Sequence, residues 1–331
     1  MSMLTLGDLA QSYAHRRANT RMTSELTRLG TELTTGLKTD KRLAGTGDSG
    51  PLSSIERSLT RLKGFDTATT EAKLFSQSTQ DVLERLSKQL GSVSSDVQQL
   101  ATDPNSADAA AKRARGAFEA SVSTLNTSVS GRTLLAGVQS SGPAMADADT
   151  MMNALRTQID GITDPAAVSR AIDDWFGEGG GFDTVGYLGG EPRATTRLSP
   201  DDDLRIDATG DDPAIRSSLA SLAKAALAAE GASDLAPQDR VELLRDAAGG
   251  TADSRSALIG LQTRIGAAQE RVEIATARNE SEKASLESAR LALISADPYE
   301  TVSRMEQVQA QLESLYTITA RMSRLSLTNY L

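Results

Sequence analysis

Apolar residues recur at alternating steps of three and four in both halves of the chain, a spacing that predicts long helices in a coiled bundle. The first long row is Leu83, Leu86, Leu90, Val93, Val97 and Leu100. The second is Leu258, Leu261, Ile265, Ala268, Val272, Ala275, Asn279, Glu282, Leu286, Ala289, Leu293 and Ala296. Shorter rows predict helices over 55–62 and 118–129. Because each half lacks a partner nearby in the sequence, we expect the two halves to pair.

Further apolar rows continue toward both ends of the sequence. One runs from Met22 to Leu37, and the other begins after Asp297 and Pro298, a pair well suited to starting a helix. Within a single chain these rows would form only a marginal two-helix hairpin, because one neighbour covers one face of each helix. We therefore predict that they form an assembly surface. Its candidate residues are Leu26, Leu29, Leu33, Leu37, Leu312, Leu315, Met322, Leu325, Leu327, Tyr330 and Leu331.

The middle of the chain has a different character. Short helices are predicted over 147–162, over 164–176 and after Asp212 and Pro213. The intervening stretch is rich in Gly, Asp and Thr, and its segments TVGYL, RATTRL and DLRID are typical of short strands joined by turns. Trp175 and Phe176 are expected to fill the core of this region.

The predicted fold is mainly α. It is a long antiparallel coiled helical bundle formed by the N- and C-terminal halves, with a small α+β insert domain. The expected parts are an N-terminal assembly arm (1–45), the N-terminal half of the bundle (46–143), a variable insert (144–250), the C-terminal half of the bundle (251–299) and a C-terminal assembly arm (300–331).

Composition narrows the range of functions. Aromatic residues make up only 3% of the 331 residues, which suits an elongated helical protein better than a globular one. The net charge of −9 argues against nucleic acid as a partner. With no cysteines, thiolate catalysis and disulfides are excluded. No apolar stretch approaches a membrane span, and the N-terminal segment lacks the features of a cleaved Sec signal.

Candidate chemistry is sparse. The single histidine, His15, excludes a metal site with two histidines, and we expect it to be solvated. The glycine-rich stretch at 177–181 and the acidic stretch at 201–203 are interpreted as turns, because they lack nucleotide-loop and calcium-loop spacing. Polar Asn279 and Glu282 in the second row indicate a register device or a locally exposed seam, with a ligand site as the alternative. We predict no enzyme activity, catalytic residue, metal or cofactor.

Three segments carry a resemblance to a known family. They are ELTTGLKTDKRLAGTGDSGPLSSI at 32–55, GRTLLAGVQSSGP at 131–143 and LSLTNYL at 325–331. The chain resembles the bacterial flagellin superfamily and, within it, the hook-filament junction family (hook-associated protein three). Leu135 stands where the family usually has phenylalanine, and Thr35 stands where serine is usual. The resemblance covers roughly 1–143 and 251–331, and the insert lies where the family diverges.

The resemblance implies a structural subunit of the bacterial flagellum, an adaptor that joins hook to filament. Such a subunit is exported by the flagellar type III system, and its terminal arms fold on assembly. The implied partners are further copies of the chain, the hook-side junction protein, flagellin and an export chaperone. The implied location is extracellular, at the hook-filament junction. No nucleic acid, membrane insertion or small-molecule substrate is expected.

Two other functions stay open at this point. The first is flagellin itself, the filament subunit, which shares the terminal helices but usually ends in a different segment, rich in glutamine and leucine. The second, from another class, is a cytosolic coiled-coil binding protein or an enzyme that carries an insert domain. The terminal LSLTNYL and the modest length favour the junction adaptor over flagellin.

Removing residues 315–331 is expected to leave a folded, soluble middle that cannot assemble, because the deleted segment belongs to the assembly surface and not to the central bundle. The thermal transition of the bundle, followed by circular dichroism, should persist. A clear loss of that transition would contradict the prediction.

Overall fold

The computed structural model describes residues 6–39, 50–100, 107–228 and 235–328. These residues are mostly helical, with two small antiparallel hairpins, which confirms a mainly α fold with a small α+β insert. The chain divides into two compact units. Met1–Leu62 and Glu280–Leu331 form one, here called the terminal unit, and Lys63–Asn279 form the other, here called the central unit. The predicted division into five parts remains a prediction.

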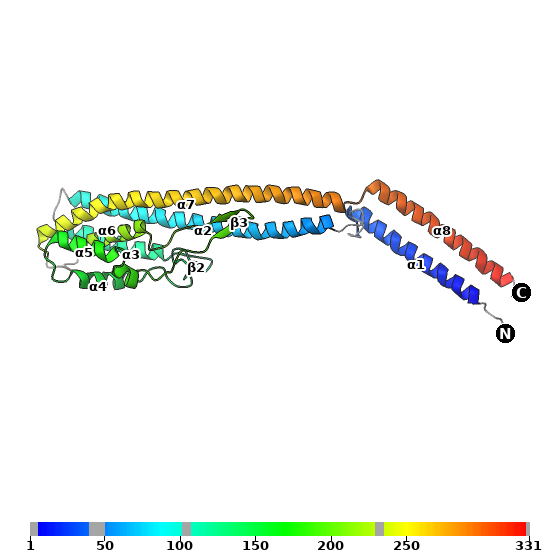
Figure 1. Ribbon diagram of the computed structural model, residues 1–331, viewed down its shortest axis with the longest axis horizontal. Helices are drawn as coiled ribbons and strands as arrows, with labels where there is room; N and C mark the ends of the chain where they lie inside the picture. The colour runs from blue at the N-terminus through cyan, green and yellow to red at the C-terminus, as the bar shows by residue number, and fades with distance from the viewer. Residues whose placement is uncertain (1–5, 40–49, 101–106, 229–234, 329–331) are drawn as a thin grey trace. The chain divides into compact units, whose positions relative to one another are not determined.

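The elements are shown in Figure 1. The helices are α1 (Leu6–Thr35), α2 (Gly50–Leu100), α3 (Ala107–Leu125), α4 (Ala148–Ile159), α5 (Pro165–Phe176), the π-helix η2 (Phe182–Gly186), α6 (Pro213–Leu227), α7 (Pro237–Ile294) and α8 (Pro298–Thr328). The strands are β1 (Ser128–Val129), β2 (Arg132–Thr133), β3 (Thr196–Ser199) and β4 (Asp202–Leu204). Strand β1 pairs with β2, and β3 pairs with β4.

The predicted seams form the core of the central unit. Helices α2 and α7 run side by side there, and α3 to α6 gather along them (Figure 1). The buried seam residues include Leu83, Leu86, Leu90, Val93, Leu258, Leu261 and Ile265. Each fully buried leucine contributes about 1.5–3 kcal/mol relative to an exposed one. The two rows that the spacing predicts are therefore joined in one core.

Asp-Pro pairs begin three of the helices. Asp164 accepts a hydrogen bond from the backbone N–H of Ala167 at the start of α5. Asp212 accepts one from Ala214 at the start of α6. Asp297 accepts from the N–H groups of Tyr299 and Glu300 at the start of α8. In each case the aspartate satisfies donors that have no partner inside the helix, and the proline needs no donor there. All three starts agree with the sequence.

Aromatic side chains fill the insert. The rings of Trp175 and Phe176 meet edge to face, with centroids 4.8 Å apart, and Phe182 lies 6.1 Å from Trp175. All three residues are buried. This confirms that Trp175 and Phe176 belong to a core.

Two local predictions were wrong. Residues 182–186 form a π-helix where TVGYL was expected to be a strand, because Phe182 is buried in the aromatic cluster and its carbonyl accepts the N–H of Tyr187 at 2.8 Å. Helix α3 ends at Leu125, so Val129 lies in β1 rather than in the predicted helix. There the side chain of Asn126 pairs with the backbone of Met145, which takes the chain out of helical geometry.

Asn279 fastens the β3–β4 hairpin to α7. Its side-chain Nδ2 donates to the carbonyl of Leu198 at 2.8 Å, and Asn279 itself is buried. Arg271 pairs with Asp202 of the same hairpin at 2.6 Å. The polar seam position is therefore a positioning residue for the hairpin. Glu282, the next position in the row, is exposed.

Replacing Asn279 with alanine should lower the free energy of unfolding of the central unit by about 1–3 kcal/mol, because the buried Leu198 carbonyl loses its donor. Urea unfolding followed by circular dichroism measures the change. Glu280→Ala, at the exposed neighbouring position, is the matched control and should leave the midpoint unchanged. Equal effects of the two substitutions would rule out the fastening role.

Candidate assembly surface

Helices α1 and α8 pack against each other as an antiparallel pair in the terminal unit (Figure 1). Leu29 is 1% exposed and is the apolar residue that this pair buries most completely. Further along, the hydroxyl of Tyr316 lies 3.4 Å from the side-chain oxygen of Asn19. The pair therefore buries a narrow line of side chains, as one helix against another must.

Backbone hydrogen bonds close the pair at one end. The N–H of Gly36 donates to the carbonyl of Glu32 at 2.8 Å, and the N–H of Ala296 donates to the carbonyl of Gly36 at 2.9 Å. The N–H of Lys38 donates to the carbonyl of Ile294 at 2.8 Å. Gly36 has φ of +68°, a left-handed conformation that ends helix α1 and favours glycine. This explains the glycine in the TTGLKT turn.

An ion network supports the same end of α1. Arg28 contacts the carboxylates of Glu25 and Glu32, and the Arg28–Glu32 distance is 2.7 Å. The buried Glu32 also accepts the N–H of Thr39 at 2.8 Å. The hydrogen bond from Arg28 holds the pKa of the Glu25 carboxyl below its ordinary value. The same bond raises the pKa of Arg28, so both groups stay charged at neutral pH.

The predicted assembly residues have different degrees of burial. Leu29 is buried, Leu26, Leu312 and Leu315 are half-buried, and Leu33 and Leu37 are exposed. The backbone of 322–328 continues α8, which contains Met322, Leu325 and Leu327, whose side chains fall outside the described part. Tyr330 and Leu331 lie outside the described residues altogether. Their role in assembly stays a prediction.

An apolar groove of about 390 Å³ runs between α1 and α8. It is lined by Met22, Gln307, Ala310, Gln311, Ser314, Leu315 and Ile318. Leu315 was predicted as a site residue, whereas Ile318 was not, although it is 50% exposed. The three-residue step from Leu315 to Ile318 places both on neighbouring positions of one helix face. That step is the sequence signal that would have found the groove.

Exposed aromatic residues extend this surface. Tyr316 on α8 and Tyr13 on α1 are both more than half exposed. His15 on α1 is half-buried, rather than solvated as expected, and its Nε2 makes no hydrogen bond within the described ranges. The terminal pair thus presents apolar and aromatic side chains outside its own contact line. Such surfaces mark sites of protein association.

The GRTLLAGVQSSGP segment has a packing role in the central unit. It contains β2, and Leu134 and Leu135 are fully or almost fully buried. Gly137 has φ of +57°, and a Cβ there would lie 2.3 Å from the carbonyl oxygens of Gly190 and Glu191. A side chain is therefore sterically forbidden at this position. Most of the loop within 32–55 and the end of LSLTNYL fall outside the described residues.

Other kinds of site were also sought. Across 6–39, 50–100, 107–228 and 235–328, no group of three or more His, Cys, Asp or Glu residues is placed to hold a metal ion. No helix of that same portion is long and apolar enough to cross a membrane.

Replacing Glu25 with glutamine should weaken the terminal unit at neutral pH by about 0.3–0.5 kcal/mol, the size expected of an ion pair within one helix. Because the folded-state pKa of Glu25 is lowered, its contribution is present above the ordinary carboxyl pKa and is lost as pH falls through the lowered value. The stability difference between wild type and Glu25→Gln, measured by urea unfolding, should vanish in acid. An unchanged difference would contradict this, and Glu306→Gln is the exposed control.

Residues 251–331 match the family of the bacterial flagellin C-terminal helical region. No curated protein matches the chain in sequence. Two solved structures share its fold. FlgL from Bacillus cereus matches with a TM-score of 0.51 and 14% identity over 70% of this chain and 96% of that one. A provisionally assigned flagellar hook-associated protein from Vibrio parahaemolyticus matches with a TM-score of 0.50 and 12% identity over 73% of this chain and 95% of that one.

The two kinds of match bear on different parts of the chain. The family match covers the end of the sequence that carries LSLTNYL, and the fold matches cover most of both molecules. Together they confirm the resemblance to the flagellin superfamily and, in fold, to solved hook-associated proteins of that superfamily.

Proposed function

We propose that this chain is a structural subunit of the bacterial flagellum, an adaptor that joins the hook to the filament. The observation that carries the proposal is the terminal unit. Its two long helices bury one line of contacts and leave a groove and exposed apolar side chains beside it. The flagellin-like C-terminal region and the hook-associated fold support a flagellar setting for that surface.

The physical reason for assembly is incomplete burial. Ordering a residue costs about 1–2 kcal/mol of backbone entropy, and an isolated helix pair recovers that cost only along its contact line. Terminal helices from neighbouring subunits would fill the groove beside Leu315 and Ile318. The assembled state would then offset the entropy that the free chain does not.

The same reasoning extends to export and partners. Terminal arms that gain most of their stability on assembly can pass unfolded through the flagellar type III channel, and a chain without cysteines needs no oxidation step afterwards. The proposed neighbours are copies of this chain, the hook-side junction protein and flagellin. An export chaperone would cover the amphipathic arms as helices held in a groove. The proposed location is extracellular, without a cleaved Sec signal.

A second candidate is the filament subunit itself. The match of 251–331 to the flagellin C-terminal region favours it, because filament subunits share that region. The sequence LSLTNYL at 325–331 favours the junction adaptor instead. Both candidates are structural and non-enzymatic, and one experiment separates them.

The test is deletion of the gene, followed by electron microscopy of the cell surface and a blot of the medium for flagellin. A junction adaptor predicts hooks without filaments and flagellin lost to the medium, because filament subunits then have nothing to build on. Plasmid-borne wild type is the control and should restore filaments.

Two results would contradict the junction role. Loss of the major filament protein from both cells and medium would make this chain the flagellin. Normal filaments and motility would remove the flagellar role and return the coiled-coil binding function.

A further inference from the structure

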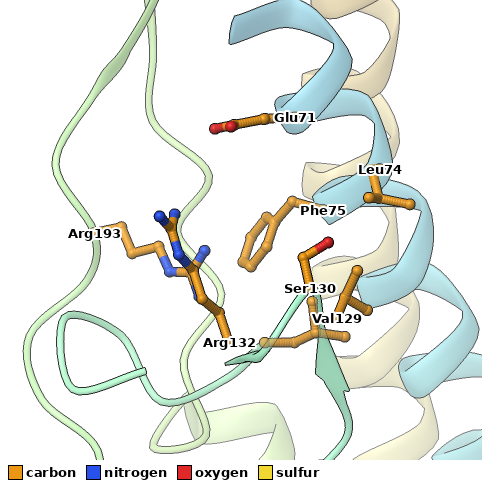
Figure 2. A pocket seen from close by; sticks show the side chains of 8 residues that line it. Glu71, Leu74, Phe75, Val129, Ser130, Arg132 and Arg193 are labelled. Atoms are coloured by element: carbon orange, nitrogen blue, oxygen red, sulfur yellow. The ribbon is translucent and has the colours of Figure 1, made fainter. Parts of the chain in front are cut away.

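A cleft of about 180 Å³ opens in the central unit between α2 and the β1–β2 hairpin. Figure 2 shows Glu71 and Phe75 on α2, Arg132 on the hairpin and Arg193 on the loop before β3 at this cleft. It lies outside the terminal unit that carries the proposed function. Two positive side chains beside an aromatic ring form an environment suited to an anionic group.

Arg193 is fixed in place without a counter-charge. Its guanidinium lies 4.4 Å from the centre of the Phe75 ring and donates to the backbone carbonyls of Thr133, at 3.0 Å, and Gly137, at 3.3 Å. These partners are neutral. Burial, and secondly the charge of Arg132, lower the pKa of Arg193, so an anion placed here would relieve both effects.

No carboxylate of the chain answers this charge. Among the described residues, neither Arg132 nor Arg193 forms an ion pair, and Glu71 at the edge of the cleft pairs with neither of them. An apolar residue adjoins the arginines, since Leu74 lines the same cleft and is 45% exposed. The complementary guest is therefore an acidic side chain next to an apolar one.

The chain itself presents such a pair on α7. Ile274 is 61% exposed, and the exposed carboxylates of Glu270 and Glu273 lie beside it. Neither glutamate forms an ion pair within the part of the chain that is described. The spacing of Glu270 and Ile274 places them one turn apart on one helix face. We call Glu270, Glu273 and Ile274 the α7 strip.

The α7 strip cannot serve its own cleft. Val272 and Ala275, which alternate with it along α7, are buried against the chain's own β3–β4 hairpin. The helical period therefore turns the α7 strip to the opposite side. None of its residues lines the cleft. A second copy must supply the guest.

We propose that the cleft of one copy binds the α7 strip of a second copy, with Arg132 and Arg193 facing Glu270 and Glu273, and Leu74 against Ile274. The proposal deepens the proposed function, because it assumes copies assembled side by side. Two different surfaces of one chain meet in this contact, so the interface is heterologous. Such interfaces continue from copy to copy and close into a ring where the rotation permits.

Cysteine cross-linking tests the geometry directly, because the chain has no cysteines of its own. The variant Leu74→Cys with Ile274→Cys, oxidised on cells and as concentrated purified chain, is expected to give a ladder of multimers. The matched control pairs Leu74→Cys with Ile259→Cys, an equally exposed position further along α7, and should stay monomeric. Equal yields from both pairs, or no ladder in either setting, would overturn the proposal.

Charge reversal tests the chemistry. In a deletion strain, Arg132→Glu alone and Glu273→Arg alone should each lower the number of filaments per cell about threefold or more, and the double variant should restore it. Arg85→Glu, an exposed arginine of α2 outside the cleft, makes the same charge change and should have no effect. A double variant no better than the worse single one, or equal effects of Arg132→Glu and Arg85→Glu, would refute the contact.

The two proposals fail in distinguishable ways. If wild type restores filaments but the charge-reversal series shows no rescue, the contact is wrong and the junction function stands. If deletion leaves filaments intact, the junction function fails, and the ladder from purified chain still decides whether the contact exists. A cross-link from Leu74→Cys to another axial protein carrying an added cysteine, without the ladder, would also overturn the second copy as occupant.

Discussion

The narrow contact between α1 and α8 is the constraint on which this account of the protein depends. Two helices in isolation bury one line of side chains, here centred on Leu29, and leave their remaining apolar surface in water. The Gly36 turn and the Arg28 network hold one end of the pair, but hydrogen bonds and partly exposed ion pairs add only modest stability. The terminal unit therefore gains much from a neighbour.

The central unit is built differently. Its helices enclose a continuous apolar core with an aromatic cluster, and polar groups such as Asn279 fasten its hairpin. Such a core is stable without further chains, so this unit can present fixed surfaces. The Arg193 cleft and the α7 strip are two of them, and both are shaped by residues whose backbone or ring contacts leave little freedom.

Periodicity in the sequence was enough to predict the long helices, and the Asp-Pro pairs predicted where three helices begin. Both signals are local, because heptad spacing and helix capping depend on residues a few positions apart. The π-helix at 182–186 and the end of α3 at Leu125 depend instead on partners far along the chain, namely Trp175 and Met145. The cleft likewise joins Phe75 to Arg193, which no spacing rule connects.

Hydrogen exchange of the isolated chain, compared with the assembled protein, tests the central claim most directly. If the terminal pair is completed only by neighbours, amides of α1 and α8 should exchange much faster than those of α7 at 258–275 in the isolated chain, and should become protected on assembly. Equal protection of all three segments in the isolated chain would contradict the account, because the pair would then be stable without a partner.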